Sequence, residues 1–388
     1  MSWKAERLDN LCTIQSGGTP PRGISRYYGG SVPWAKIGDM ESADGVAVET
    51  EECITEEGLS AIGNRLFPKG TVLLAMYGSV GKVAVAGVEM TTNQAILGIE
   101  VTDTKRLDCG YLRRWLSSVR STLERDARGV TQKNISATLV RSLEIPLPPL
   151  PEQRRIAAIL DQADALRAKR REALAQLDSL TQSIFIEMFG DPASNPLGIR
   201  KTSLGSLANI ATGSTPGREV QEHFGGNIPW VKTTEVRGEP IHDTEEHLTD
   251  LGLRAIRGKL HPAGSIVVAM YGQGQTRGRS GLLAIPASCN QACGVIHPSD
   301  HFDSLFMFCQ LRQAYEQLRA LGRGGNQENL NLQILGAFEV LLPTRALQQT
   351  FATRIQAVEA LKATHRAALS ELDALFASLQ HRAFAGQL

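Results

Sequence analysis

The chain has 388 residues and lacks the features that define several common classes of protein. None of its six cysteines forms a Cys-x-x-Cys pair, which argues against a zinc site or a disulfide framework and favours reduced thiols. Its longest apolar runs, such as residues 266–270, are far shorter than the roughly 20 residues that cross a bilayer, and its N-terminus has no apolar signal core. We therefore expect no membrane association and a cytoplasmic location.

An excess of positive charge is also missing. The chain has 41 Lys and Arg against 40 Asp and Glu, whereas a clearly basic surface is the usual electrostatic signature of a protein that binds nucleic acid. Charge alone therefore gives weak support for DNA binding.

Complete motifs for catalysis are absent too. Residues 78–83, Gly-Ser-Val-Gly-Lys-Val, lack the earlier Gly and the Ser or Thr after Lys that a Walker A motif needs, and residues 272–278 miss the dinucleotide-binding spacing by one position. There is no Asn/Asp-Pro-Pro-aromatic methyltransferase motif, no metal-ligand cluster and no nucleophile elbow. We predict no catalytic residues, no cofactor and no metal.

What the sequence does contain is an internal duplication. Residues 11–20 return as 207–216 and residues 28–36 return as 224–232, both 196 positions later. Shorter matches follow at offsets between 194 and 197, including Ala-Met-Tyr-Gly at positions 75 and 269. A period this long indicates two complete domains of like fold rather than a solenoid of small units.

Each copy ends in a segment without glycine. From Pro151 to about Phe189, Ala, Leu, Arg, Gln and Glu dominate, which predicts one long helix. The prolines of residues 146–151 prevent an earlier start, and Gly190 followed by Pro192 ends the helix. A second long helix is predicted from Thr344 or Arg345 to Phe384.

Both predicted helices have apolar residues at heptad spacing, which requires a partner helix. We expect them to pack as an antiparallel pair. Arg170 and His365 fall at the same seam position, where they could fix the register or reach to solvent. The first seam position contains Ile156, Ala163, Arg170, Leu177 and Ile184, with Phe351, Val358, His365, Leu372 and Leu379; the second contains Ile159, Leu166, Ala173 and Leu180, with Leu361, Ala368 and Leu375.

The predicted fold class is α+β: two similar mixed α/β globular domains joined by two long antiparallel, coiled-coil-like helices, with a pseudo-twofold internal repeat. The predicted boundaries are 1–150 for the first globular domain, 151–190 for the first spacer helix, 191–343 for the second domain and 344–388 for the second helix. Antiparallel helices would hold the domains up to roughly 57 Å apart at 1.5 Å per residue. Strands are expected at residues 71–75 and 265–269, but their order does not follow from the sequence.

In the order and duplication of its motifs, the chain resembles the specificity (S) subunits of type I restriction-modification systems. The resemblance covers nearly the whole chain and includes Gly-Gly-Thr-Pro at 17–20 with its counterpart at 213–216, Val-Pro-Trp and Ile-Pro-Trp, and residues 129–135, 146–153 and 185–192. Only residues 343–349 depart from the pattern.

This resemblance implies a non-catalytic targeting subunit. Each of its two target-recognition domains would read one half of a bipartite site in double-stranded DNA. Two methyltransferase (M) subunits would dock on the helices, and endonuclease/translocase (R) subunits would bind through the complex. Partner subunits would then supply basic surface that this chain lacks.

Residues that match between the copies should build the fold, whereas residues that differ should read DNA bases. The loop after Met-Tyr-Gly differs most, because Gln and Arg residues replace a shorter segment, and in the major groove Arg favours guanine and Gln favours adenine. A solvated hairpin tip is the alternative. The predicted base contacts are Ser79, Lys82, Gln273, Gln275, Thr276, Arg277 and Arg279.

Shared polar residues are candidates for phosphate contacts, which position a domain without reading sequence. For the threonines a structural cap is equally compatible, and for the amides the alternative is a hydrogen bond that holds a loop. Tyr77 and Tyr271 could stack on a displaced base, although core packing is favoured for them, as for Trp34 and Trp230. The polar candidates are Thr19, Arg22, Lys36, Gln132, Lys133, Thr215, Arg218, Lys232, Asn326 and Gln327.

Basic residues on the helices are candidates for partner docking or for spanning the spacer DNA, with a solvated face as the alternative. They are Arg154, Arg155, Arg167, Lys169, Arg170 and Arg171. A different function also stays open at this point, namely a non-catalytic scaffold protein whose duplicated protein- or glycan-binding domains are held apart by the helical pair.

Overall fold

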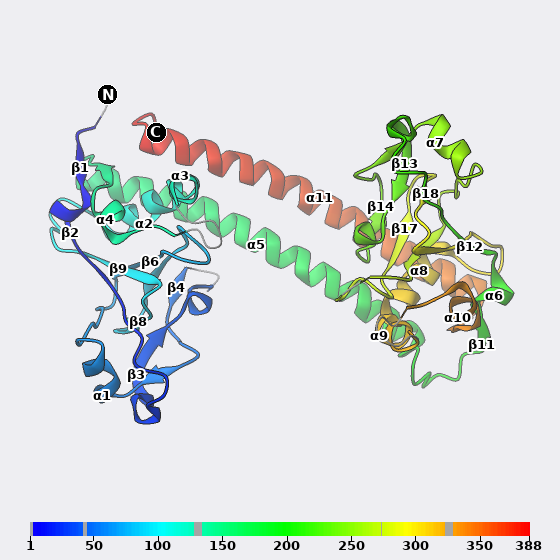
Figure 1. Cartoon of the computed structure of the whole chain (residues 1–388), viewed down its shortest axis with the longest axis horizontal. Coiled ribbons are helices and arrows are strands. Elements are labelled where there is room, and N and C mark those ends of the chain that lie inside the picture. The colour runs from blue at the N-terminus through cyan, green and yellow to red at the C-terminus, as the bar shows by residue number, and fades with distance from the viewer. Residues whose placement is uncertain (1–2, 42–44, 128–133, 273, 323–328) are drawn as a thin grey trace. The chain divides into compact units, whose positions relative to one another are not determined.

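The computed structural model describes residues 3–41, 45–127, 134–272, 274–322 and 329–388. The chain divides into two compact units, which are Met1–Ala173 with His365–Leu388, and Leu174–Thr364. Each unit contains one globular domain and parts of both long helices, α5 (Leu150–Phe189) and α11 (Arg345–Phe384) (Figure 1). Among the described residues, no helix is both long and apolar enough to cross a membrane.

The first domain is built on a five-stranded sheet with the order β2-β9-β6-β7-β4, in which only the β4–β7 pair is parallel. A three-stranded sheet, β5-β3-β8, and a pair, β1-β10, complete the strands. The bounds are β1 Ala5–Arg7, β2 Cys12–Ser16, β3 Tyr28–Ala35, β4 Val46–Ala47, β5 Cys53–Ile54, β6 Val72–Ala75, β7 Val83–Ala86, β8 Thr91–Thr92, β9 Ile96–Val101 and β10 Glu144–Pro146. The helices are α1 Glu56–Ala61, α2 Cys109–Ser118, α3 Arg120–Asp126 and α4 Ala137–Arg141.

The second domain repeats this topology strand for strand. Its sheets have the orders β12-β19-β16-β17-β14, β15-β13-β18 and β11-β20, so β11 to β20 are the counterparts of β1 to β10. The strands are β11 Lys201–Ser203, β12 Ile210–Thr212, β13 Phe224–Val231, β14 Pro240–Ile241, β15 His247–Leu248, β16 Ile266–Ala269, β17 Ser280–Leu283, β18 Ser288–Cys289, β19 Cys293–Ile296 and β20 Glu339–Leu341. The helices are α6 Leu204–Leu207, α7 Asp250–Ala255, α8 Ser304–Gln313, α9 Tyr315–Ala320 and α10 Leu332–Ala337. The predicted repeat and fold class are confirmed.

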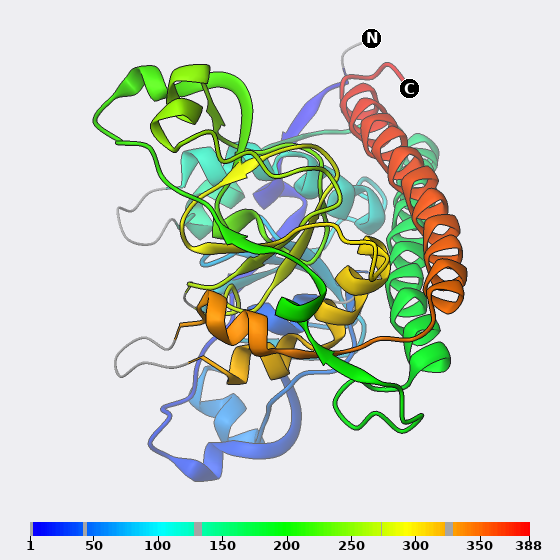
Figure 2. The same ribbon diagram turned by 90° about the vertical axis from the view of Figure 1, so that its right-hand side faces the viewer.

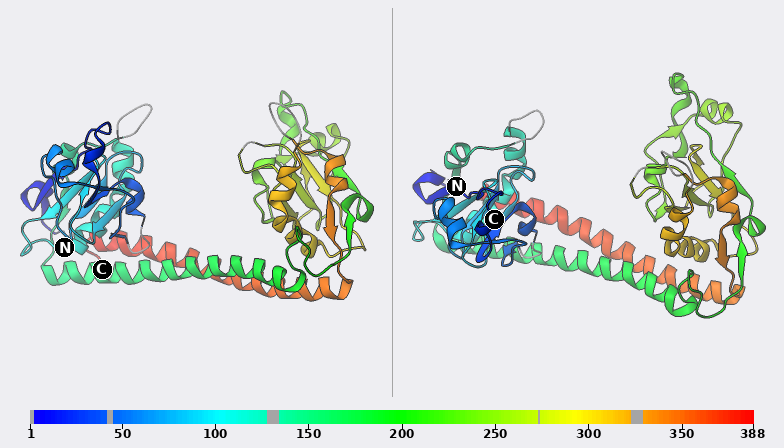
Figure 3. Two further views of the ribbon diagram at one scale, coloured as in Figure 1. Left: turned by 90° about the horizontal axis from the view of Figure 1, so that it is seen from below. Right: turned by 60° about the horizontal axis from the view of Figure 1, so that its bottom comes forward.

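Within each unit the long helices lie side by side and run antiparallel (Figures 2 and 3). In the first unit, Arg167 Nε is 2.6 Å from Asp373 Oδ1, and Arg170 Nη1 donates to His365 Nδ1 at 3.3 Å. In the second unit, Lys362 Nζ is 2.8 Å from Asp178 Oδ1. The contact between Arg170 and His365 favours the register role over the solvent-facing alternative.

The predicted second seam position is wrong. Leu166, Leu180, Leu361 and Leu375 are 54%, 43%, 46% and 51% exposed. The heptad argument assumed that each helix packs only on the other helix, whereas each pair also packs on its globular domain. Flanking residues such as Leu160 and Ile355 are therefore buried in the domain cores, and the outer leucines are left exposed.

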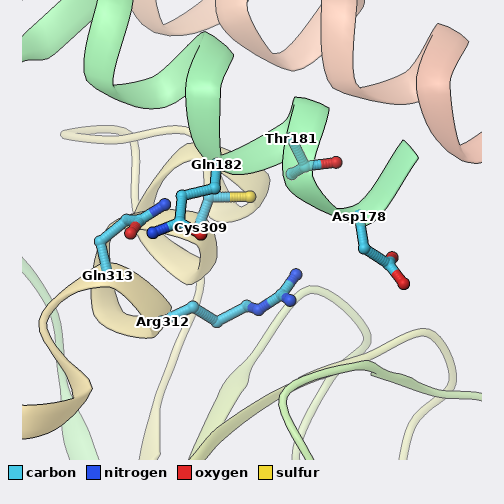
Figure 4. A pocket seen from close by; sticks show the side chains of 6 residues that line it. All are labelled: Asp178, Thr181, Gln182, Cys309, Arg312 and Gln313. Atoms are coloured by element: carbon cyan, nitrogen blue, oxygen red, sulfur yellow. The ribbon is translucent and has the colours of Figure 1, made fainter. Parts of the chain in front are cut away.

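The contacts between the long helices and the domains differ between the units where α2 and α8 meet the long helices. In the first unit, buried Arg114 on α2 donates to Asp161 and Asp164 at 2.6 and 2.9 Å, and its guanidinium is 6.0 Å from the Phe376 ring. In the second unit the counterparts of Arg114 and Phe376 are the smaller Cys309 and Thr181. A cavity of about 150 Å³ lies there between α5 and α8 (Figure 4), lined by Asp178, Thr181, Gln182, Cys309, Arg312 and Gln313.

Candidate nucleic-acid interface

The loop of residues 17–22 is held by side chains of its own domain. Trp34 Nε1 donates to the Gly18 carbonyl at 2.9 Å, and Tyr28 Oη donates to the Pro20 carbonyl at 2.5 Å. The Thr19 hydroxyl donates to the side-chain oxygen of Gln94. The Thr19 hydroxyl therefore has a structural role, which is the alternative to a phosphate contact.

The cations predicted to contact phosphate are paired with carboxylates. Arg22 donates twice to Glu52, at 2.6 and 3.3 Å, and its guanidinium lies 4.8 Å from the rings of Tyr28 and Trp34. Lys36 reaches Glu51 at 2.5 Å and Glu52 at 2.9 Å. Hydrogen bonds from Arg22 and Lys36 lower the pKa of the Glu52 carboxyl to about 2. We call Arg22, Lys36 and Glu52 the first clamp.

The second domain contains the same arrangement, which we call the second clamp: Arg218, Lys232 and Glu246. Arg218 is 2.5 Å from Glu246 and lies over the rings of Phe224 and Trp230, at 4.8 and 4.9 Å. Lys232 is 3.0 Å from both Glu245 and Glu246, and the Thr215 hydroxyl donates to Gln291. Each cation of the clamps has a carboxylate partner in its own domain, and these ion pairs order the loops. Contact of the same cations with phosphate stays a prediction.

The loop of residues 77–82, the first loop, is anchored by an apolar side chain. Val80 is only 6% exposed and belongs to the domain core, against which Tyr77 also packs. Lys82 forms an ion pair with Glu41 at 2.8 Å. Ser79 is half-buried.

The loop of residues 271–279, the second loop, ends in the same backbone pairing. Gly278 N donates to Ala269 O, and Ala269 N donates to Arg279 O. In the first loop, Gly81 N donates to Ala75 O, and Ala75 N donates to Lys82 O. Thr276 and Arg277 therefore align with Ser79 and Val80, and residues 273–275 are an insertion.

Side chains of the second loop are more accessible to a ligand. Tyr271 is 41% exposed, so the core interpretation is wrong for it, whereas Trp34 and Trp230, each 1% exposed, are confirmed as core. Gln275 is exposed and Arg279 half-buried. Arg279 Nη2 donates to Gln275 Oε1 at 2.8 Å, so its partner is a neutral amide where Lys82 has a carboxylate.

Five of the predicted DNA contacts lie outside the described residues: Gln132, Lys133, Gln273, Asn326 and Gln327.

Two further amides repeated in both copies, Asn93 and Asn290, accept hydrogen bonds from the backbone of Ala95 and Ala292, at 3.0 and 3.2 Å, and so hold their own loops. The sequence reasoning missed Glu52 and Glu246. Their position in Glu-Glu pairs repeated 194 residues apart could have indicated a shared role.

The fold and these loops define a duplicated recognition protein, in which one scaffold occurs twice and presents a different polar loop each time. The chain belongs to the family described as type I restriction modification DNA specificity domain, which matches residues 1–176 and 196–374. It is a specificity subunit whose function is DNA recognition, and the scaffold alternative is not supported.

Relatives support this assignment over most of the chain. The MjaIX specificity subunit of Methanocaldococcus jannaschii is 24% identical over 375 residues, covering 91% of this chain and 86% of the relative. The EcoR124I/EcoR124II specificity subunit of Escherichia coli is 29% identical over 189 residues, covering 47% and 45%. The solved S subunit from M. genitalium shares the fold, with a TM-score of 0.61, 17% identity, and coverage of 99% of this chain and 96% of that one.

Proposed function

We propose that the chain is the non-catalytic targeting subunit of a type I restriction-modification complex and reads a bipartite site in double-stranded DNA, one half with each domain. The observation that carries this proposal is the contrast between matching clamps and differing loops. A shared clamp positions each loop in the same way, while the side chains on the loop set which bases are read.

The proposed base contacts follow from this contrast. In the first domain they come from Ser79 and Lys82. In the second they come from Gln275, Thr276, Arg277 and Arg279, with Tyr271 as a stacking surface. Gln273 and the polar residues at positions 132, 133, 326 and 327 stay in the proposal as predicted contacts.

Exchanging the loops tests this proposal. Residues 79–80 would be replaced by residues 273–277 in an otherwise unchanged chain, and modified bases would be mapped in host DNA by long-read sequencing. We expect one half-site to change and the other to stay. A matched control exchanges residues 51–54 with residues 245–248. These segments share the Glu-Glu pair and differ only in their last two residues, so the exchange should leave both half-sites unchanged. Changes in both halves, or in neither, after the loop exchange would count against the assignment.

The exposed leucines support docking of two methyltransferase subunits, with endonuclease/translocase subunits bound through the complex. Leu166 and Leu375 flank the ion pair of Arg167 and Asp373 in the first unit. Leu361 and Leu180 flank the equivalent pair of Lys362 and Asp178 in the second. Exposed small residues adjoin them: Ala165, Ala374, Ala360 and Ser179.

A surface on which large apolar side chains flank paired charges suits a protein partner better than DNA. Its presence at equivalent positions in both units supports one partner copy per unit. Of the basic residues predicted to dock a partner or span the spacer DNA, Arg155 is ion-paired with Glu152, and Arg167 with Asp164 and Asp373.

Charge substitutions separate the two docking surfaces. L166E with L375E should remove one methyltransferase subunit from the purified complex, and adding L361E with L180E should remove the second, as counted by native mass spectrometry. L251E is the matched control, because Leu251 is 51% exposed on α7, away from the long helices in sequence. Retention of both subunits by the fourfold variant would refute this docking surface.

A further inference from the structure

Helix α9 supports the second loop at several points. Tyr315 Oη donates to the Gln275 carbonyl at 2.8 Å. Gly278 has a positive φ of 85°, and a Cβ there would lie 3.2 Å from Arg319 N. A Cβ on Gly322, just after α9, would lie 3.1 Å from Arg277 Cζ. The loop backbone therefore follows the surface of α9 closely.

The Tyr315 hydroxyl is itself held in place. Arg319 Nη1 donates to Tyr315 Oη at 2.8 Å, while that hydroxyl donates its own proton to Gln275 O. An arginine can only donate, so the hydroxyl must act as acceptor towards Arg319 and as donor towards the loop. Tyr315 and Arg319 thus fix the backbone of Gln275.

The side chain of Gln275 is fixed by a second contact. Its Oε1 accepts from Arg279 Nη2 at 2.8 Å. Because Arg279 has no acceptor, the amide oxygen must face the guanidinium and the amide NH2 must face away from it. The groups that the pair can offer to a ligand are then mainly N–H donors, from Gln275 Nε2 and from the remaining guanidinium nitrogens.

A surface of donors distinguishes among base edges. In the major groove guanine presents two acceptors, N7 and O6, whereas adenine presents the acceptor N7 beside the donor N6. Gln reads adenine with its oxygen and nitrogen together, but here the oxygen is engaged by Arg279. The pair is therefore complementary to guanine.

We propose that Tyr315 and Arg319 are positioning residues that hold Gln275 and Arg279 as a pair of hydrogen-bond donors. This pair recognises a guanine in the half-site read by the second domain, called here the second half-site. This inference rests on the proposed function of the second loop. Beyond that function, it identifies the base as guanine and assigns a positioning role to Tyr315 and Arg319, which lie outside the loop.

The first domain provides an internal control. The counterparts of Tyr315 and Arg319 are Arg120 and Glu124, which pair with each other at 2.8 Å. The first loop is anchored by buried Val80 instead. Substitutions at position 315 should therefore affect only the second half-site.

The test uses the complete complex with its partner subunits. Binding would be measured to the recognised duplex and to duplexes in which each guanine of the second half-site is replaced in turn by 7-deazaguanine, which lacks the N7 acceptor. We expect one position at which wild-type affinity falls about tenfold, on the scale of one lost hydrogen bond to a charged group. R279A should bind both duplexes equally.

Y315F tests positioning separately from contact. It should reduce discrimination at that guanine about fivefold to tenfold and leave affinity for non-specific DNA and reading of the first half-site unchanged. R120A is the matched control and should leave the second half-site unchanged. Unchanged reading of the other bases of the second half-site by Y315F shows that the second domain is folded.

The outcomes separate the two proposals. If no 7-deazaguanine replacement in the second half-site lowers wild-type affinity, or if Y315F reads the second half-site like wild type, the inference is overturned while the proposed function survives. If neither R279A nor the loop exchange alters any half-site, the proposed function itself fails.

Discussion

The first and second loops occupy the same place in two copies of one domain and end in the same backbone pairing, but their side chains are held by different interactions. The first is short and inserts Val80 into the core, so its position is coupled to the stability of the domain. The second is three residues longer and replaces that anchor with Arg277, while polar contacts from Tyr315, Arg319 and Arg279 order it. A polar anchor on the surface lets loop residues change without loss of core packing, which suits a site that must vary in specificity.

The largest expected effect comes from breaking the apolar anchor. Val80→Asp would bury a carboxylate and should lower the free energy of unfolding of the first unit by about 3 kcal/mol or more. Calorimetry should show the unfolding transition of the first unit shifting to a lower temperature. Ser79→Asp, one residue away and half-buried, is the control and should cost less than about 1 kcal/mol. Equal effects would mean that Val80 is not the anchor.

A second difference between the units lies where α2 and α8 meet the long helices. Arg114→Ala should destabilise the first unit by about 2 kcal/mol, because Asp161 and Asp164 lose a partner but are partly exposed to water. The matched change in the second unit, Cys309→Ala, removes one buried sulfur atom and should cost about 1 kcal/mol. Denaturant titration of each variant measures both values, and a larger loss from Cys309→Ala would contradict this account.

The pH dependence of stability should distinguish a paired Glu52 from a free one. Its pKa is lowered from 4.5 to about 2, so its stabilising contribution is complete above pH 4.5 and is lost as the pH falls through 2. The change in unfolding free energy from this carboxyl should stay near 1 kcal/mol, because Glu52 is 31% exposed and water screens its ion pairs. Unfolding free energies from pH 6 to 2 should therefore fall more steeply for wild type than for E52Q. The second clamp should behave alike, since Arg218 lowers the pKa of Glu246. Parallel slopes would show that the first clamp contributes nothing.

The sequence predicted those features that depend on a repeated or continuous pattern. The duplication, the two helices and their ends followed from matching segments and from the missing glycines between Pro151 and Phe189. The shared seam position of Arg170 and His365 followed from heptad phase, and the contact between them decides between the two roles that the sequence left open. These are local or periodic signals, which need no knowledge of tertiary packing.

Other features depend on contacts that a pattern does not encode. Heptad spacing marked Leu166 and Leu375 as apolar, but their exposure depends on how the helix pair packs on a domain. Similarly, nothing in the spacing of Arg22 and Lys36 shows that Glu52 lies beside them. Arg277 aligned with Val80 only when the backbone hydrogen bonds located the insertion.

The smallest expected effect comes from the loss of a single hydroxyl beside the clamps. Tyr28 donates to the Pro20 carbonyl, whereas its counterpart Phe224 has no hydroxyl to donate to Pro216. Tyr28→Phe should therefore cost the first unit about 0.5–1 kcal/mol, the usual net value of a neutral hydrogen bond, and leave the Arg22 ion pair in place. Phe224→Tyr is the reciprocal variant and should stabilise the second unit by a similar or smaller amount. Hydrogen exchange at the equivalent Gly18 and Ser214 amides, which donate to Thr92 O and Cys289 O, would show which loop has changed. If Tyr28→Phe costs nothing, the rings and the clamp alone order the first loop, as they do in the second domain.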